Sequence, residues 1–145
     1  GSLLFNKFFK GIAPLHSMNS LDEWINELQQ TDQLILVEGE KDKAALNALS
    51  ITNVLTVSKT PIHKIIEEVV KRNKRVVILT DLDREGKKYY ATLRHQLQKQ
   101  GVKIDTTFRE FLFKETTLSH IEGLTRYRRK TLYMASKIGS PVLKL

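Results

Sequence analysis

Hydrophobic residues recur along the chain with two different spacings, which predict strands and helices in turn. Four short apolar runs, rich in β-branched residues, predict strands at Gln33–Glu38, Asn53–Val57, Arg75–Thr80 and Val102–Thr106. Around them, apolar residues three and four positions apart predict amphipathic helices at Ser20–Gln30, Lys41–Leu49, Pro61–Arg72, Asp83–Gln100, Phe108–Lys114 and Leu118–Leu124. Strands that alternate with helices are typical of an α/β fold with a mainly parallel, four-stranded sheet.

Local residues mark the ends of several predicted helices. Ser20, with Glu23 three positions later, has the pattern of a capping box. Thr60 is placed to cap the third helix, which would have Pro61 as its first residue. The long charged helix after the third strand is expected to end at Gly101.

Two of the predicted strands end in acidic turns that lead into a helix. The first turn lies in Val37-Glu38-Gly39-Glu40-Lys41-Asp42, and the second lies in Leu79-Thr80-Asp81-Leu82-Asp83-Arg84-Glu85-Gly86. In a parallel α/β sheet, ligands bind in the crevice beyond the carboxyl ends of the strands. We therefore expect Glu38, Asp81 and Asp83 to converge there. For this the first and third strands must be neighbours, which gives the strand order 2-1-3-4.

The two motifs together resemble the signature of Toprim domains, which occur in topoisomerases, primases and several small nucleases. That signature is a strand ending in Glu-Gly with an Asp shortly afterwards, then a later strand ending in Asp-x-Asp-x-x-Gly. Glu38 and Asp81 are 43 residues apart, which leaves room for the two helices and one strand of that domain. The resemblance covers residues 21–127 and is greatest to the small stand-alone Toprim proteins of archaea and bacteria.

The resemblance implies a three-layer, Rossmann-like Toprim fold and a metal-dependent site. The residues that match Glu38, Asp81 and Asp83 carry metal binding and catalysis in the family, and Gly39 and Gly86 match its turn glycines. The residue types agree with this, because Mg²⁺, or Mn²⁺ in its place, takes carboxylate oxygens as ligands. Asp81 and Asp83 can share one ion or bridge two, whereas Glu38 can complete a second site or act as a general acid or base.

Other residues near the turns have two interpretations each. Acidic residues are favoured at helix N-termini by the helix dipole alone, and this explanation is strongest for Asp42, whereas Glu40 and Glu85 are expected to be solvated rather than to bind metal. Four basic residues are candidates for binding a phosphate or are simply solvated: Lys41, Lys59, Arg84 and Lys87. His63 and His120 lack metal-like spacing, and Tyr89 and Tyr90 are expected to pack within a helix.

Charge is unevenly distributed along this chain of net charge +8. Basic and acidic residues balance between Met18 and Thr125, so the excess comes from the two ends. An RNA or DNA partner would then be attracted by the C-terminal segment, in which basic residues flank an aromatic residue able to stack on a base: Arg126, Tyr127, Arg128, Arg129 and Lys130. The same segment also suits a solvated terminal helix.

Composition excludes some classes of protein. The chain has no cysteine, so it forms no disulfide and no thiolate metal site. No apolar run approaches the roughly 20 residues needed to cross a bilayer, so we expect a cytoplasmic protein without a membrane partner. We expect a Toprim domain at residues 18–125 and a basic tail or helix at 126–145. Residues 1–17 begin with Gly1-Ser2, as after protease cleavage, and are either an added or engineered segment or a natural amphipathic lead-in.

Three functions fit these observations. The first is a small nuclease or RNA or DNA processing factor that binds Mg²⁺. The second is a nucleic-acid-binding or assembly subunit that depends on a protein partner and has no turnover of its own. The third is a Toprim scaffold engineered at its N-terminus for peptide display. A topoisomerase or complete primase is not expected, because those proteins need additional domains that a chain of 145 residues does not have room for.

Overall fold

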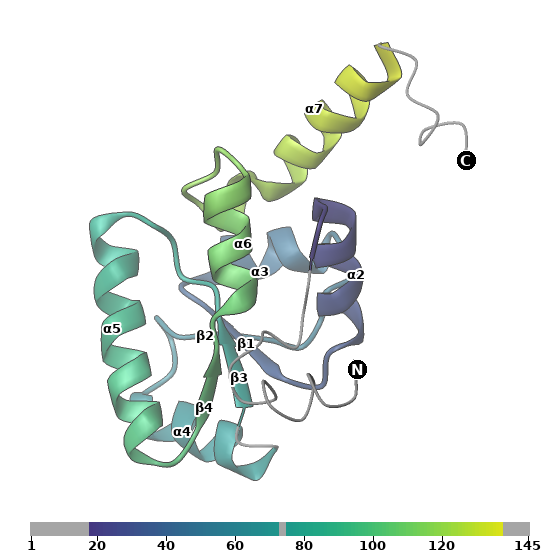
Figure 1. Ribbon diagram of the computed structural model, residues 1–145. Helices are drawn as coiled ribbons and strands as arrows, with labels where there is room; N and C mark the ends of the chain where they lie inside the picture. The colour runs from purple at the N-terminus through teal and green to yellow at the C-terminus, as the bar shows by residue number, and fades with distance from the viewer. Residues whose placement is uncertain (1–17, 73–74, 138–145) are drawn as a thin grey trace, which may run out of the picture.

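A computed structural model describes residues 18–72 and 75–137. It is an α/β fold with one parallel sheet (Figure 1), built from β1 (Leu34–Val37), β2 (Val54–Thr56), β3 (Arg75–Ile78) and β4 (Lys103–Asp105). The strands lie in the order β2-β1-β3-β4, which confirms the predicted order. In register, Ile35 of β1 lies between Val54 of β2 and Val77 of β3. The carboxyl ends of β1 and β3 are therefore adjacent.

Seven helical segments surround or extend this sheet in the described part of the chain. They are α2 (Leu21–Gln30), α3 (Glu40–Asn47), α4 (Ile62–Lys71), α5 (Arg84–Lys99), α6 (Thr107–Glu115), the 3₁₀ helix η1 (Ile121–Gly123) and α7 (Leu124–Lys137). Ser20 caps α2 as expected, because its hydroxyl accepts a hydrogen bond from the Glu23 backbone at 3.1 Å. None of these helices is long and apolar enough to cross a membrane.

Helices cover both faces of the sheet, and this gives three layers with a core on each side. Alternate residues of β1 belong to different cores, because Ile35 and Val37 face one side and Leu34 and Leu36 face the other. The first core joins the sheet to α2, α3 and α6, and includes Trp24, whose indole N–H donates to the Phe108 carbonyl at 2.8 Å. The second core joins the sheet to α4 and α5. Burial on both faces explains the uninterrupted apolar run of β1.

Two local predictions need correction. Thr60 does not cap α4, because its hydroxyl donates to the Thr56 carbonyl at 2.9 Å and the helix begins at Ile62 without a side-chain cap. The helix predicted at Leu118–Leu124 is only the short turn η1, after which α7 begins at Leu124. Helix α7 then extends away from the body of the domain (Figure 1). The predicted lead-in at 1–17 and the chain beyond Lys137 lie outside the described residues.

Candidate metal centre

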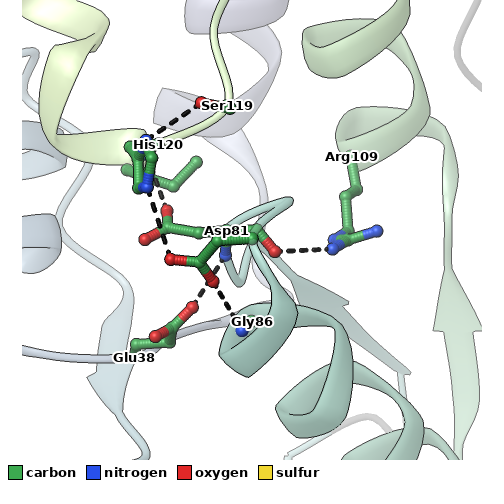
Figure 2. A network of polar contacts seen from close by, with 8 residues as sticks. Glu38, Asp81, Gly86, Arg109, Ser119 and His120 are labelled. Carbon is green, nitrogen blue, oxygen red and sulfur yellow. Dashed lines mark hydrogen bonds and ion pairs between the residues drawn. The ribbon is translucent and has the colours of Figure 1, made fainter.

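The two acidic turns meet at the carboxyl edge of the sheet, as the sequence predicts. Glu38 directly follows β1, and its Oε1 accepts a hydrogen bond from the backbone N–H of Asp81 at 2.9 Å. This contact joins the first turn to the second across 43 residues of sequence (Figure 2). The pairing of β1 with β3 explains it, because parallel neighbours end at the same edge.

Asp81 is held on several sides. The residue is only 8% exposed, and its Oδ1 accepts a hydrogen bond from the Ile121 backbone at 2.8 Å. Its carbonyl accepts another from Nη2 of Arg109 at 2.9 Å, so α6 also positions this residue (Figure 2). Together with the Glu38 contact, these bonds fix both the backbone and the carboxylate of Asp81.

Asp83 has two roles in the structure. It is the N-cap of α5, where its Oδ1 accepts a hydrogen bond from the Gly86 backbone at 2.7 Å. Its other oxygen, Oδ2, lies 3.3 Å from Nε2 of His120, a residue in the loop before η1. Helix capping therefore accounts for one oxygen of Asp83 and leaves the second directed at His120.

Asp81, Asp83 and His120 form a group with the chemistry of a metal site. Each offers one ligand atom, and these atoms all lie within 4.8 Å of one another. Asp81 is buried in this group, whereas Asp83 and His120 are exposed to solvent. Sequence reasoning missed His120, because it comes 37 residues after Asp83 (120 − 83) and no pattern links the two. Only the path of the chain into η1 brings it to the edge of the sheet.

Burial makes the carboxylates of this region costly to ionise. Desolvation raises the pKa of Asp81, against the lowering effects of the Ile121 N–H and of His120. Desolvation likewise raises the pKa of Glu38, helped by the charges of Asp81 and Asp83 and opposed by the hydrogen bond from Asp81. The pKa of Asp42 is raised for the same first reason, followed by the charge of Asp81. Mutual repulsion of this kind is relieved when a cation binds.

Comparison with known proteins agrees with this geometry. Residues 32–108 match the Toprim domain family, and the matched segment contains both acidic turns. The chain belongs to the Toprim family. It is 32% identical to a UPF0292 protein of Methanocaldococcus jannaschii over 111 residues, which cover 74% of this chain and 87% of that protein. It is 34% identical to a UPF0292 protein of Pyrococcus abyssi over 101 residues, which cover 69% and 75%.

A solved structure supports the same assignment. A protein from Aquifex aeolicus has a TM-score of 0.68 and 36% sequence identity to this Toprim protein, over 72% of this chain and 98% of that one. His120 lies beyond the segment that matches the Toprim domain family. It comes from the part of the chain that follows α6.

The two glycines of the Toprim motif have different surroundings. A Cβ added at Gly86 would lie 2.1 Å from the Asp81 carbonyl oxygen and 2.7 Å from Oε1 of Glu38. A Cβ added at Gly39 would meet only Oγ of Ser58, at 3.9 Å. Gly39 is also extended, with φ of −142°, so any residue can adopt its backbone conformation. The close approach of Asp81 and Glu38 therefore requires a glycine at position 86, whereas no such contact requires one at position 39.

Only some of the other predicted site residues lie beside Glu38 and Asp81. A hollow of about 320 Å³ contains Glu38, Asp42 and Asp81, and Lys41 also lines it. Three other basic candidates are exposed and do not line it: Lys59, Arg84 and Lys87. Asp42 is buried and accepts a hydrogen bond from the Gly39 backbone at 3.2 Å, which supports its structural interpretation.

The residues of the basic segment at the start of α7 differ in their contacts and in their exposure to solvent. Arg128 contacts Asp22 of α2 at 3.4 Å, and Tyr127 is half-buried. Arg126, Arg129 and Lys130 are exposed along a helix that leaves the domain. Those three cations are the most exposed part of the predicted nucleic-acid segment.

Proposed function

We propose that this Toprim protein is a metal-dependent phosphodiesterase that cleaves RNA or DNA. Asp81, Asp83 and His120 bind the divalent cation, and Glu38 acts beside it as the general base. The observation that carries this proposal is the group of three ligand atoms within 4.8 Å, at the edge of the sheet where α/β proteins bind ligands. Family membership supports the same reaction class.

The donor set fits a divalent cation. Two carboxylates suit Mg²⁺, which usually keeps several waters and binds one or two carboxylates plus phosphate oxygens. The imidazole of His120 adds a nitrogen donor, which favours Mn²⁺ or another transition metal for the complete set. A cation bound there would polarise a phosphoryl oxygen of the substrate. The other oxygens of the two aspartates are already fixed by backbone N–H groups of Ile121 and Gly86.

Glu38 is suited to proton transfer. One of its oxygens is held by the Asp81 N–H, which orients the carboxylate toward the second turn. The raised pKa of Glu38 moves its titration toward neutral pH, where a general base works best. We therefore assign Glu38 the role of accepting a proton from the attacking water.

A second function is favoured by the charge around the site. Of the charged residues that line the 320 Å³ hollow, only Lys41 is basic, whereas the acidic ones are Glu38, Glu40, Asp42, Asp81, Glu85 and Glu122. Such a surface repels a phosphate backbone until metal is bound. A Toprim subunit that binds metal but depends on a protein partner for nucleic-acid affinity fits this observation.

The test combines metal binding with cleavage. We would titrate Mn²⁺ and Mg²⁺ by calorimetry into the wild type and Asp81→Asn/Asp83→Asn, then incubate both with labelled single- and double-stranded RNA and DNA. Asp32→Asn serves as the matched control, because Asp32 is an exposed carboxylate just before β1, at the opposite end of that strand. Binding and cleavage lost together in the double variant alone support the nuclease. Binding without cleavage supports the partner-dependent subunit, and absence of binding contradicts both.

A further inference from the structure

A second hollow lies beside the candidate metal centre, on the other side of the Asp81 backbone. Its volume is about 540 Å³, within the range of about 300 to 1,000 Å³ that is typical of small-molecule sites. Residues of α5, of α6 and of the loop after β3 line it, among them Leu82, Tyr90, Arg109, Glu110, Phe113 and Lys114. In Figure 2, Arg109 approaches the Asp81 carbonyl from the side opposite His120. We call this space the Arg109 hollow.

Arg109 is held rigidly within this hollow. Its Nε donates to the Thr80 carbonyl at 3.1 Å, and its Nη2 donates to the Asp81 carbonyl at 2.9 Å. The guanidinium carbon lies 4.4 Å from the ring centroid of Tyr90 and 5.4 Å from that of Phe113. Because two carbonyls and two rings hold the guanidinium, a ligand that binds to it meets a preorganised donor.

The charge of Arg109 has the carboxylates of Asp81 and Glu38 near it but is in direct contact with neither. Within residues 18–72 and 75–137, no acidic side chain lies at ion-pair distance from it. Arg109 is half-buried, and burial lowers the pKa of the guanidinium against the opposing effects of Tyr90, Asp81 and Glu38. The N–H groups on Nη1 have no acceptor among the same residues. A half-buried cation with unused donors at the wall of a hollow is a site for an anion.

The lining adds a second chemical preference. Tyr90 and Phe113 are only partly buried and both line the hollow, so the ring surface that Arg109 does not cover is available for a nucleobase to stack on. Lys114 supplies a second cation, whereas Glu110 supplies one opposing charge. A ligand that combines a phosphate with an aromatic base uses both the cations and the rings.

We propose that the Arg109 hollow binds one nucleoside phosphate, namely the nucleotide adjacent to the one at the metal centre on the substrate strand. This inference rests on the proposed function for the identity of the strand. The geometry places the Arg109 hollow next to the candidate metal centre. Arg109 contacts the carbonyl of Asp81, and the carboxylate of the same residue is one of the proposed metal ligands. A nucleic-acid strand that runs along the carboxyl edge of the sheet passes the metal centre at the ends of β1 and β3. It then reaches the ends of β3 and β4, where Thr106 also lines the Arg109 hollow.

Binding is measured first without metal. We would add AMP, adenosine and inorganic phosphate to the ¹⁵N-labelled protein in EDTA and follow the amide chemical shifts. The proposal expects AMP to bind more tightly than either fragment and to shift Leu82, Arg109 and Phe113. Equal binding of AMP and phosphate, or shifts elsewhere, would overturn it.

Variants at exposed positions then test the charges without disturbing the fold. Lys114→Gln should weaken AMP binding about fivefold, and Glu110→Gln should strengthen it about threefold, as expected for single exposed charges. The matched control is Lys103→Gln, because Lys103 is an exposed cation at the start of β4, on the opposite edge of the sheet. If Lys114→Gln and Glu110→Gln change affinity no more than Lys103→Gln does, the proposal is wrong.

Competition distinguishes a strand from a free nucleotide. A short single-stranded oligonucleotide that displaces AMP supports a subsite for the strand, whereas AMP binding that resists displacement overturns it in favour of a free-nucleotide site. The AMP-binding measurement is independent of the cleavage test, because AMP should still bind to Asp81→Asn/Asp83→Asn in EDTA. Failure of cleavage with intact AMP binding therefore contradicts the proposed nuclease, and the reverse result contradicts this subsite.

Discussion

The two acidic turns have the same pattern of strand, acid and helix, yet the structure uses them differently. The first turn, residues 38–42, makes fewer contacts of this kind: Asp42 accepts a local hydrogen bond from Gly39, whereas Glu38 and Glu40 contact other parts of the chain. The second turn, residues 81–86, is contacted by side chains or backbone from five distant positions: Glu38, Arg109, Ser119, His120 and Ile121. The second turn is therefore the centre of the site, and the first turn supports it.

The largest expected difference between the turns is at their glycines. Gly86→Ala should destabilise the protein by about 3 kcal/mol, because the new Cβ meets the rigid Asp81 backbone at 2.1 Å. Gly39→Ala should change stability by no more than about 1 kcal/mol, since its Cβ has room and the helix loses only a favourable N-cap residue. Urea unfolding of both variants measures this. Equal losses would mean that the two turns are equally constrained.

The next difference concerns the carboxylates. Asp81→Asn should weaken Mn²⁺ binding by at least about 100-fold, because it removes a ligand that the fold holds on several sides. The unfolding temperature without metal should not fall, since an amide oxygen can still accept from Ile121 and the costly buried charge is gone. Asp42→Asn should weaken Mn²⁺ binding less than about fivefold.

Calorimetry and thermal unfolding of these two variants provide the measurement. A similar loss of affinity in both would contradict the assignment of metal ligands to the second turn rather than to the first. Loss of stability in Asp81→Asn without metal would show that its carboxylate serves the fold more than the site.

Sequence reasoning predicted the parts of this site that local pattern determines. The strand order and the meeting of Glu38 with the second turn follow from two apolar runs that each end in an acid, and both are present. His120 and Arg109 were not predicted, because each reaches Asp81 or Asp83 through tertiary packing of segments with no motif of their own. Thr60 shows the same limit, since a hydroxyl that can cap a helix bonds a strand carbonyl instead.

His120 allows a smaller test of the second turn. His120→Ala should weaken Mn²⁺ binding about tenfold, less than Asp81→Asn does, because His120 is exposed and the two aspartates remain. Mg²⁺ binding should change less, since Mg²⁺ prefers oxygen ligands. His63→Ala, at an exposed position of α4, is the matched control. Equal losses of affinity for Mn²⁺ and Mg²⁺ in His120→Ala would argue that His120 is not a metal ligand and only balances the charge of Asp83.

The smallest effect expected is the pH dependence of stability without metal. The pKa of Glu38, Asp42 and Asp81 is raised in the folded protein, so the folded chain binds protons more tightly than the unfolded chain between the ordinary carboxyl pKa and the raised one. Protonated carboxyls therefore favour folding at low pH, and this contribution is lost as the pH rises through that range. Other carboxylates also titrate there, so the comparison with a variant isolates the effect.

Thermal unfolding in EDTA at several pH values between about 4 and 7 measures that comparison. The unfolding temperature of Asp81→Asn relative to the wild type should rise with pH, by about 3 °C across the range, because only the wild type has the buried charge. Asp42→Asn should follow the same direction, since burial raises the pKa of Asp42 for the same reason. Saturating Mn²⁺ should reverse the difference for Asp81→Asn, because the cation stabilises the ionised wild type, but not for Asp42→Asn. A reversal in both variants would place Asp42 among the ligands and remove the distinction between the two turns.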